Sequence, residues 1–272
     1  MDVFQQIEAA NRCSTPLVYL VTPDPMEAMR KVGEAVKSKG TALYAWDAVR
    51  GCRAVNPKAK AKIWIEPGEA SGDPLSLLLG AIADPQQGGG LPAKSILIAQ
   101  NLSRHWDNAL TTQAIWNLRD EFKKNSRTLL MIGPSIIGSV PEELKDDLIV
   151  LEEELPSEEV ITAIIDDAAE TAKVEFKQFL YPDETRKRAV SALRGLAAFP
   201  AEQVSFMAIR EAGFDLEALW EHKRVAMERT PGISLARAKV KYADVGGCEA
   251  IKAAFRRRCA GPQPPSGIGR ID

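Results

Sequence analysis

The sequence predicts an α/β fold, a parallel sheet with flanking helices, followed by a small helical lid-like subdomain. Three observations predict it. Between residues 16 and 152, short apolar segments alternate with segments of helical character, as in chains of right-handed βαβ crossovers. Segments such as "PLVYLVT" are continuously apolar, which is typical of strands buried on both faces of a sheet. After residue 152 the pattern is purely helical.

The helix after the first strand has recognisable ends. Asp24 can cap it, Pro25 suits its first turn, Glu27 completes a capping box, and Gly40 ends it. The expected elements up to residue 152 are helices over 2–12, 24–40, 73–84 and 105–124, and strands over 16–22, 41–46, 61–66, 95–101, 127–133 and 148–152, with one helical turn at "PEELKDD" before the last strand.

The helix over 105–124 contains an apolar repeat. Leu110, Ala114, Leu118 and Phe122 recur every four residues and are expected to form one apolar face.

The rest of the chain completes a three-part organisation. We expect an α/β domain over residues 1–155, a helical subdomain over 156–230, and a connector over 231–272 that ends in a linker rich in proline and glycine. The helices of the subdomain are expected over 157–173, 183–197, 201–212 and 215–229.

Composition excludes several classes of protein. The formal net charge of -2 provides no overall attraction to nucleic acid or to anionic membranes. The N-terminus lacks the features of a signal peptide, and no segment reaches the roughly 18 apolar residues of a membrane span, so a cytoplasmic location without a membrane partner is expected. The 4 cysteines form no C-x-x-C pair and there are only 2 histidines, so no metal ligands are predicted.

The end of the first strand lacks a phosphate-binding loop. Such a loop follows the pattern G-x-x-x-x-G-K-[ST], because backbone N–H groups and a lysine must face the phosphates. The sequence has "PDPMEAM" instead, without glycine or lysine, with a proline that removes one donor, and with the carboxylate of Asp24 where phosphate would approach. This strand end is predicted not to bind phosphate.

Two other segments partly match the same pattern. "GGGLPAKS" (88–95) has Lys94 and Ser95 in place but leads into a strand, whereas a true loop of this kind leaves a strand and opens a helix. "GPSIIGSV" (133–140) has the glycine spacing but no lysine. A flexible loop and a turn are the simpler interpretations, while nucleotide binding through Lys94 stays open as an alternative.

Other candidate chemistry is sparse. The strand "SILIAQN" ends in Gln100 and Asn101, which cannot supply the anionic Mg²⁺ ligand found at this position in nucleotide hydrolases. No nucleophile and base can be paired around the two distant histidines, so no catalytic residue is predicted. Arg256, Arg257 and Arg258 form a compact basic cluster, interpreted either as a solvated helix face or as a nucleic-acid adaptor.

Residues 242–258, "YADVGGCEAIKAAFRRR", resemble the segment that opens the ATPase core of AAA+ proteins. In that family the segment lies against the adenine ring. The resemblance implies that Asp244 and Gly246 would line an adenine pocket and that Val245 and Gly247 would shape the turn. The simpler interpretation of the same residues is a tight turn in a generic α/β protein.

The preceding residues resemble the N-terminal half of one AAA+ group, which includes a chloroplast-encoded family and bacterial and phage relatives. In this group a degenerate P-loop-like α/β domain and a helical lid precede the ATPase domain. The resemblance rests on "YAWDAVRG", "SILIAQN", "LEALWEHKR" and the stretch from "RTLLMIG" to "LPSEEV".

This resemblance implies a function for a full-length protein. Such a protein would bind ATP and Mg²⁺ and hydrolyse ATP to remodel a partner. The catalytic motifs would lie beyond Asp272, so the chain is expected to be a fragment or a truncated product and not an enzyme by itself. Regulation, oligomerisation or substrate engagement is the expected role, through a protein partner or self-assembly. Alternatives are a stand-alone nucleotide-binding protein or a nucleic-acid adaptor.

Overall fold

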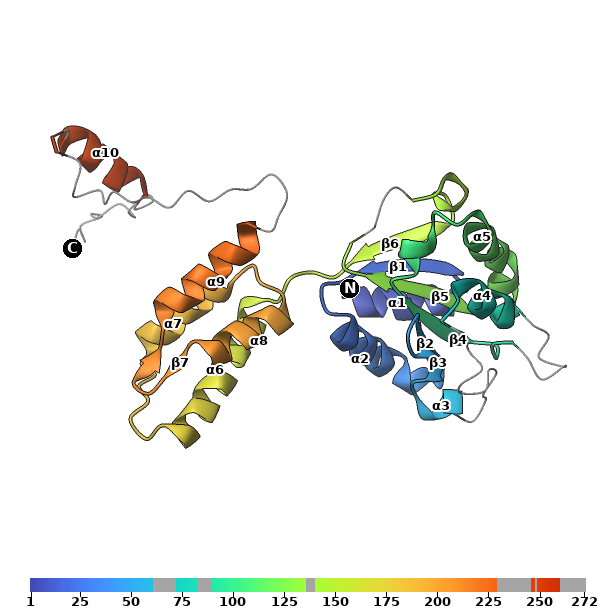
Figure 1. The fold of residues 1–272 in the computed structure, drawn as a ribbon, viewed down its shortest axis with the longest axis horizontal. Helices are drawn as coiled ribbons and strands as arrows, with labels where there is room; N and C mark the ends of the chain where they lie inside the picture. The colour runs from blue at the N-terminus through green and yellow to red at the C-terminus, as the bar shows by residue number, and fades with distance from the viewer. Residues whose placement is uncertain (61–71, 83–89, 136–139, 229–245, 248, 260–272) are drawn as a thin grey trace, which may run out of the picture. The chain divides into compact units, whose positions relative to one another are not determined.

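The computed structural model of the chain describes residues 1–60, 72–82, 90–135, 140–228, 246–247 and 249–259. The chain divides into two compact units, residues 1–223 and 224–272. The first contains a six-stranded sheet with its helices, and then a helical segment (Figure 1). The short strand expected over 61–66 lies outside the described residues.

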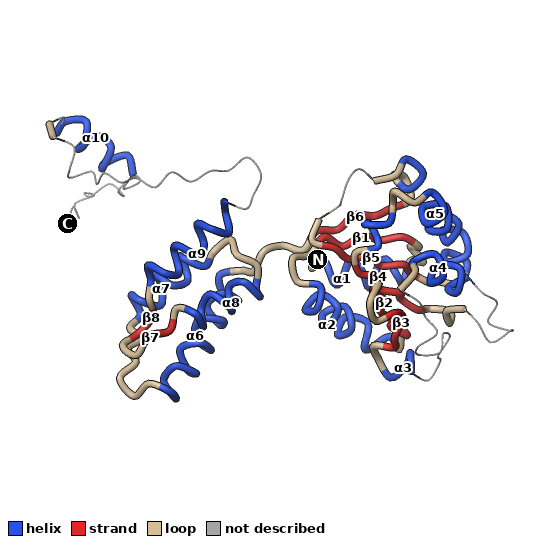
Figure 2. Tube along the Cα trace, viewed as in Figure 1, coloured by secondary structure: helices blue, strands red, loops and turns tan. Residues whose placement is uncertain are grey.

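The sheet has the strand order β3-β2-β4-β5-β1-β6, and all pairs are parallel except the hairpin of β2 and β3. The parallel sheet that the sequence predicts is therefore present, and β3 adds one antiparallel edge strand to it (Figure 2). The strands are β1 (Leu17–Val21), β2 (Ala42–Asp47), β3 (Gly51–Ala54), β4 (Ser95–Gln100), β5 (Thr128–Gly133) and β6 (Leu148–Glu152).

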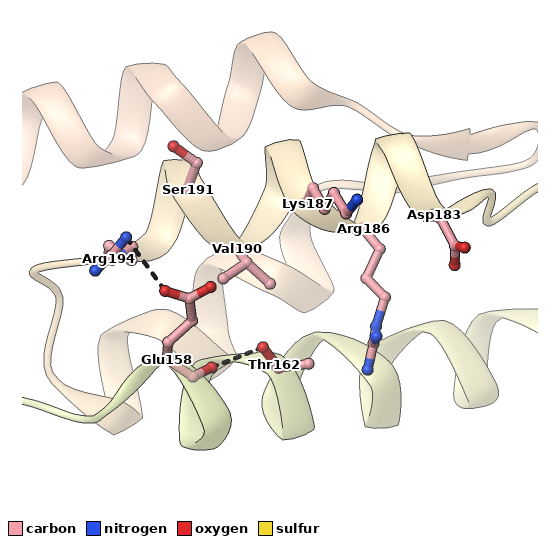
Figure 3. Close-up of a pocket in the computed structure, with 8 residues that line it drawn as sticks. All are labelled: Glu158, Thr162, Asp183, Arg186, Lys187, Val190, Ser191 and Arg194. Atoms are coloured by element: carbon pink, nitrogen blue, oxygen red, sulfur yellow. Dashed lines mark hydrogen bonds and ion pairs between the residues drawn. The ribbon is translucent and has the colours of Figure 1, made fainter. Parts of the chain in front are cut away.

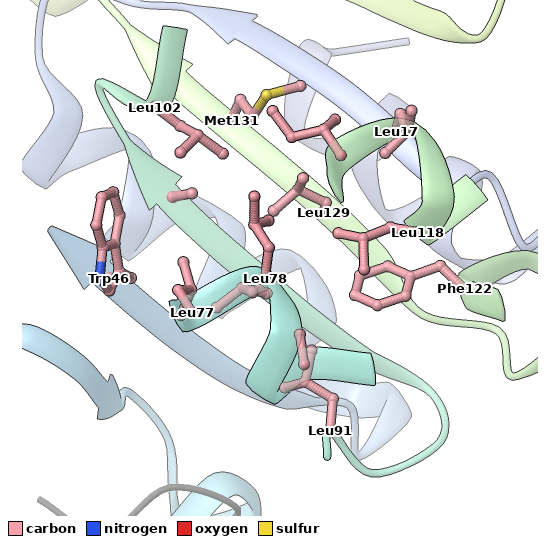
Figure 4. Packing of buried hydrophobic residues seen from close by; sticks show 14 of the residues in the cluster. Leu17, Trp46, Leu77, Leu78, Leu91, Leu102, Leu118, Phe122, Leu129 and Met131 are labelled. Carbon is pink, nitrogen blue, oxygen red and sulfur yellow. The ribbon is translucent and has the colours of Figure 1, made fainter. Parts of the chain in front are cut away.

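Helices cover both faces of the sheet. One face packs against α1 (Val3–Arg12) and α2 (Pro25–Val36), and the other packs against α4 (Pro74–Ile82) and α5 (Ala109–Lys124). Successive side chains of a strand point to opposite faces, so both faces of β1 are apolar and buried. Figure 4 shows the apolar cluster on the face that packs against α4 and α5. In it, Leu17, Leu129 and Met131 of the sheet contact Leu118 and Phe122 of α5.

The ends of α2 are partly as predicted. Asp24 caps the helix, since its carboxylate accepts a hydrogen bond of 3.1 Å from the backbone N–H of Glu27. The predicted capping box is not complete, because the carboxylate of Glu27 accepts from Arg30 Nε at 2.7 Å instead. Gly40, with a φ of 66°, ends the short 3-10 helix η1 (Lys37–Lys39) that extends α2.

The apolar face predicted for α5 is wrong at one residue. Leu110 is 65 % exposed, whereas Ala114, Leu118 and Phe122 are buried and Ile115 joins them. An α-helix turns once in about 3.6 residues, so a repeat of four residues rotates about 40° at each step. After several steps the first residue has left the face that packs against the sheet.

The helical segment differs from its predicted pattern by a small hairpin. Strands β7 (Ile209–Arg210) and β8 (Gly213–Phe214) pair antiparallel, where only helices and breaks are expected. Strands of two residues are too short to show a periodicity of two, so the sequence pattern does not reveal them. The helices are α6 (Glu158–Glu175), α7 (Asp183–Leu193), α8 (Ala198–Met207) and α9 (Leu216–Glu228).

The remaining short helices are α3 (Pro57–Lys60), η3 (Leu102–His105), η4 (Glu142–Leu144) and α10 (Glu249–Cys259). The domain boundaries predicted at 155/156 and 230/231 stay predictions. Within the described part of the chain, no helix has both the length and the apolar character that a membrane crossing requires.

Candidate functional site

The carboxyl edge of the sheet is the place where α/β folds of this kind hold ligands. Strand β1 lies between β5 and β6, and the chain leaves it through α2 to reach β2 on the far side of β4. Ligands bind outside the carboxyl ends of the strands, at the point where the strand order reverses. The residues that follow β1, β4 and β5 are therefore the candidates.

The end of β1 is occupied by a network of side chains. The hydroxyl of Thr22, a fully buried residue, donates to Glu153 Oε2 at 2.5 Å and accepts from the backbone N–H of Asp24 at 3.1 Å. Lys31 Nζ, from α2, donates to Glu153 Oε1 at 2.9 Å. A lysine does stand near this strand end, but its charge is paired with a carboxylate of the same chain.

The N-terminus of α2 offers little to an anion. Phosphate sites at helix ends use free backbone N–H groups and the positive end of the helix dipole. Here the carboxylate of Asp24 accepts from the N–H of Glu27, and Pro25 has no N–H to donate. That this strand end does not bind phosphate stays a prediction.

The side chain of Tyr19, from β1, reaches the residues that follow β4 and β5. Its hydroxyl lies 3.0 Å from Ser103 Oγ and donates to the carbonyl oxygen of Ser135 at 2.9 Å. Burial raises the pKa of the Tyr19 phenol, against the opposing effect of the hydrogen bond with Ser103. Gly133 makes room for this hydroxyl, because a Cβ there would lie 2.5 Å from it.

Gln100 and Asn101 occupy the end of β4. Gln100 Nε2 donates to Met29 Sδ at 3.1 Å, and Asn101, with a φ of 55°, turns the chain into η3. Amide side chains cannot replace the carboxylate that binds Mg²⁺ in nucleotide hydrolases. Among the described residues, no group of three or more His, Cys, Asp or Glu side chains could hold a metal ion.

Asp47, at the end of β2, is a residue that the sequence analysis missed. Its carboxylate accepts from the backbone N–H groups of Val49 (3.1 Å) and Arg50 (2.8 Å), from Arg50 Nε (2.7 Å) and from Arg53 Nη1 (2.8 Å). Burial alone would raise the pKa of Asp47, but these hydrogen bonds outweigh it and lower the pKa to about 2. The signal in the sequence is an aspartate followed by two nearby arginines across a turn.

The residues predicted to lie beside adenine are only partly described. Asp244 and Val245 lie outside the described residues. Gly246 and Gly247 are exposed, and no described residue beyond their chain neighbours lies within 4 Å of a Cβ built on either one. Gly247 has a φ of 73°, a conformation that suits glycine in a turn before α10. The adenine-side role of these residues stays a prediction.

The other predicted candidates are distributed as follows. Lys94 precedes β4 and so lies at the amino edge of the sheet, the opposite end from a P-loop lysine. Residues 136–139 of the second partial match lie outside the described residues. Arg256, Arg257 and Arg258 belong to α10, but their side chains are outside the described part.

The helical segment has a cavity of about 490 Å³ between α6 and α7 (Figure 3). Two of its three cations are paired: Arg194 with Glu158 at 3.2 Å, and Arg186 with Asp166, to which Arg186 Nε donates at 2.8 Å. Mixed charges that neutralise one another give this cavity no clear preference for a ligand. Its lining residues are Glu158, Thr162, Asp183, Arg186, Lys187, Val190, Ser191 and Arg194.

A family model agrees with this architecture. The model for the N-terminal domain of SpoVK-like AAA ATPases matches residues 3–153, which is more than half of the chain and runs from α1 through β6. The chain belongs to this family. The SpoVK-like domain therefore includes the whole sheet and the carboxyl edge described above. No curated protein matches the chain.

Solved structures of AAA+ proteins are similar in fold to this SpoVK-like chain. PCH-2 of C. elegans superposes with a TM-score of 0.51 at 9% identity, over 84% of this chain and 69% of PCH-2. The RuvB branch migration motor of Thermotoga maritima gives 0.46 at 12% identity, over 83% and 67%. A chain of the HORMA:CdnC:Trip13 complex from E. coli MS115-1 gives 0.48 at 10% identity, over 86% of this chain and 79% of that chain. At these identities the likeness to PCH-2 shows the fold alone, an AAA+ P-loop NTPase-like fold.

Proposed function

We propose that this chain is the non-catalytic N-terminal part of an AAA+ ATPase, with a role in regulation, oligomerisation or substrate engagement. In a longer protein that includes an ATPase core, ATP hydrolysis with Mg²⁺ would serve to remodel a partner protein. The parts of the chain would be the α/β domain (1–155), the helical subdomain (156–230) and a connector (231–272), with Asp244 to Gly247 on the adenine side of the core.

The observation that carries this proposal is the filled carboxyl edge of the sheet. A nucleotide site there needs free N–H donors, an unpaired lysine and an anionic metal ligand. Instead, Lys31 is paired with Glu153, and the hydroxyl of Tyr19 is bonded to Ser103 and Ser135, which follow β4 and β5. These residues do not fit Mg²⁺ and ATP. An AAA+ fold whose own nucleotide position is filled supports a binding or regulatory role.

The test compares two ligands that share a triphosphate. We expect the chain to show no Mg²⁺-dependent ATP hydrolysis above buffer, and calorimetry to show no preference for ATP over inorganic tripolyphosphate. A true nucleotide site also recognises the base and sugar, so it would bind ATP more tightly. Such a preference, lost on Lys94→Ala, would favour the stand-alone nucleotide-binding alternative. The same preference kept in Lys94→Ala would contradict the filled carboxyl edge.

A further inference from the structure

A second pocket lies at the amino edge of the sheet, which the proposed function does not use. Its volume is about 260 Å³, and every residue that lines it is polar or charged. We name it the amino-edge pocket. It is lined by Glu8, Asn11, Arg12, Lys39, Thr41, Lys94 and Ser126.

Three cations from separate parts of the chain meet in this pocket. Arg12 ends α1, Lys39 ends η1, and Lys94 directly precedes β4. None of the three forms an ion pair with a described residue, and Glu8 is the one carboxylate in the lining. Like charges held close together repel one another, and a bound anion would relieve this repulsion.

Buried polar groups form part of the pocket wall. Thr41 is 6 % exposed, and its hydroxyl has no hydrogen-bond partner among the described residues. Because Thr41 lines the pocket, this hydroxyl is available to donate to a ligand there. Asn11, 7 % exposed, donates from Nδ2 to Thr128 Oγ1 at 3.1 Å and to the carbonyl oxygens of Ser95 and Ser126 at 3.4 Å. This amide holds the starts of β4 and β5 in place beneath the pocket.

The backbone around the pocket is in an uncommon conformation. Lys94 has a φ of 56° and Ser126 a φ of 54°, and neighbouring Ser14 has a φ of 59°. The hydroxyls of Ser14 and Ser126 lie 2.9 Å apart. Residues other than glycine rarely adopt positive φ, and such residues cluster where a structure holds a ligand.

We propose that the amino-edge pocket binds a small phosphate group, either inorganic phosphate or the phosphate of a monoester. Arg12, Lys39 and Lys94 would neutralise its charge, and the hydroxyl of Thr41 would donate to one of its oxygens. Ligand pockets for larger molecules measure roughly 300–1,000 Å³, so this volume suits a single phosphate group and not a whole nucleotide. Since β4 has 6 residues, about 20 Å separates this pocket from the carboxyl edge.

The helix dipole is a competing explanation for the positions of Arg12 and Lys39. A cation in the last turn of a helix is stabilised by the negative end of the helix dipole, and Arg12 and Lys39 occupy such positions. Lys124 has that role in the last turn of α5 but does not line the pocket, so it is the matched control. Lys94 belongs to no helix, so the dipole does not explain it.

The experiment titrates inorganic phosphate into the full chain by calorimetry, at an ionic strength matched with chloride. Saturable binding is expected for the native sequence, and a loss of affinity of about tenfold or more for Lys94→Asn. Asparagine tolerates positive φ, so this variant is expected to fold normally, which its melting temperature checks. Arg12→Gln is expected to weaken binding similarly, and Lys124→Gln by less than about twofold.

Two further titrations, with glycerol phosphate and with acetate, identify the anion. Glycerol phosphate that binds as inorganic phosphate does would support recognition of the phosphate group, whereas binding of inorganic phosphate alone would support a free-ion ligand. Acetate binding as tightly as phosphate would overturn the proposal. So would the absence of saturable phosphate binding, unchanged affinity in Lys94→Asn, or an equal loss of affinity in Lys124→Gln.

Discussion

Replacing Gly133 by alanine is expected to destabilise the folded chain by about 1–3 kcal/mol, the range found when a well-packed core is overfilled. A Cβ at this position would lie 2.5 Å from the hydroxyl oxygen of Tyr19, far inside ordinary contact. That hydroxyl cannot simply move, because it is bonded to Ser103 and Ser135 and Tyr19 is fully buried. The free energy of unfolding, measured by urea titration, is the observable.

A double-mutant cycle tests the cause of this effect. Tyr19→Phe alone is expected to cost about 1–2 kcal/mol, since it leaves the partners of the hydroxyl without their hydrogen bonds. With the hydroxyl removed, the nearest remaining atoms to the new Cβ lie at 3.5 Å, which is ordinary contact. The cost of Gly133→Ala should therefore shrink in the Tyr19→Phe background, with a coupling of at least about 1 kcal/mol. Simple additivity would refute the proposed packing of Tyr19 against Gly133.

Asp47→Asn is expected to lower the stability of the chain by about 2 kcal/mol at neutral pH, and by much less near pH 2. The pKa of Asp47 in the folded chain is about 2. In an unfolded chain an aspartate has a pKa of about 3.9. The contribution of the ionised carboxylate is therefore complete above that value, and it is lost as the pH falls through about 4 toward about 2.

The measurement compares the unfolding free energies of the native sequence and Asp47→Asn across that pH range. Asp120→Asn is the control, because Asp120 is also bonded to an arginine, Arg119, but its side chain is 81% exposed. Exposed ion pairs contribute little to stability, so this control should change the unfolding free energy only slightly. A gap between the native sequence and Asp47→Asn that stays constant with pH would show that the carboxylate is not the cause.

Both predictions concern side chains that close the carboxyl edge of the sheet. The hydroxyl of Tyr19 lies against Gly133, and Asp47 holds the turn between β2 and β3. Internal hydrogen bonds therefore engage these side chains at the carboxyl edge. This agrees with the proposal that the domain binds or regulates a partner instead of hydrolysing nucleotide.

Several features of this protein could be determined from the sequence alone. The continuously apolar segments predict the four buried strands β1, β2, β4 and β5, because a strand buried on both faces has few polar positions. Asp24 and Gly40 mark the two ends of one helical region, since capping depends on residues close together in the chain. The lack of glycine and lysine after the first strand likewise excludes a P-loop there.

The contacts between residues far apart in the sequence are known only from the tertiary structure. The hydroxyl of Tyr19 meets Ser103 and Ser135, which lie 84 and 116 positions away in the chain. Lys94 stands out in the sequence as part of an incomplete phosphate loop, but nothing in the sequence indicates that it lies beside Arg12 and Lys39. Patterns in a sequence record local conformation and burial. Which distant residues share a pocket depends on the strand order, and therefore on pairings between segments far apart in the chain.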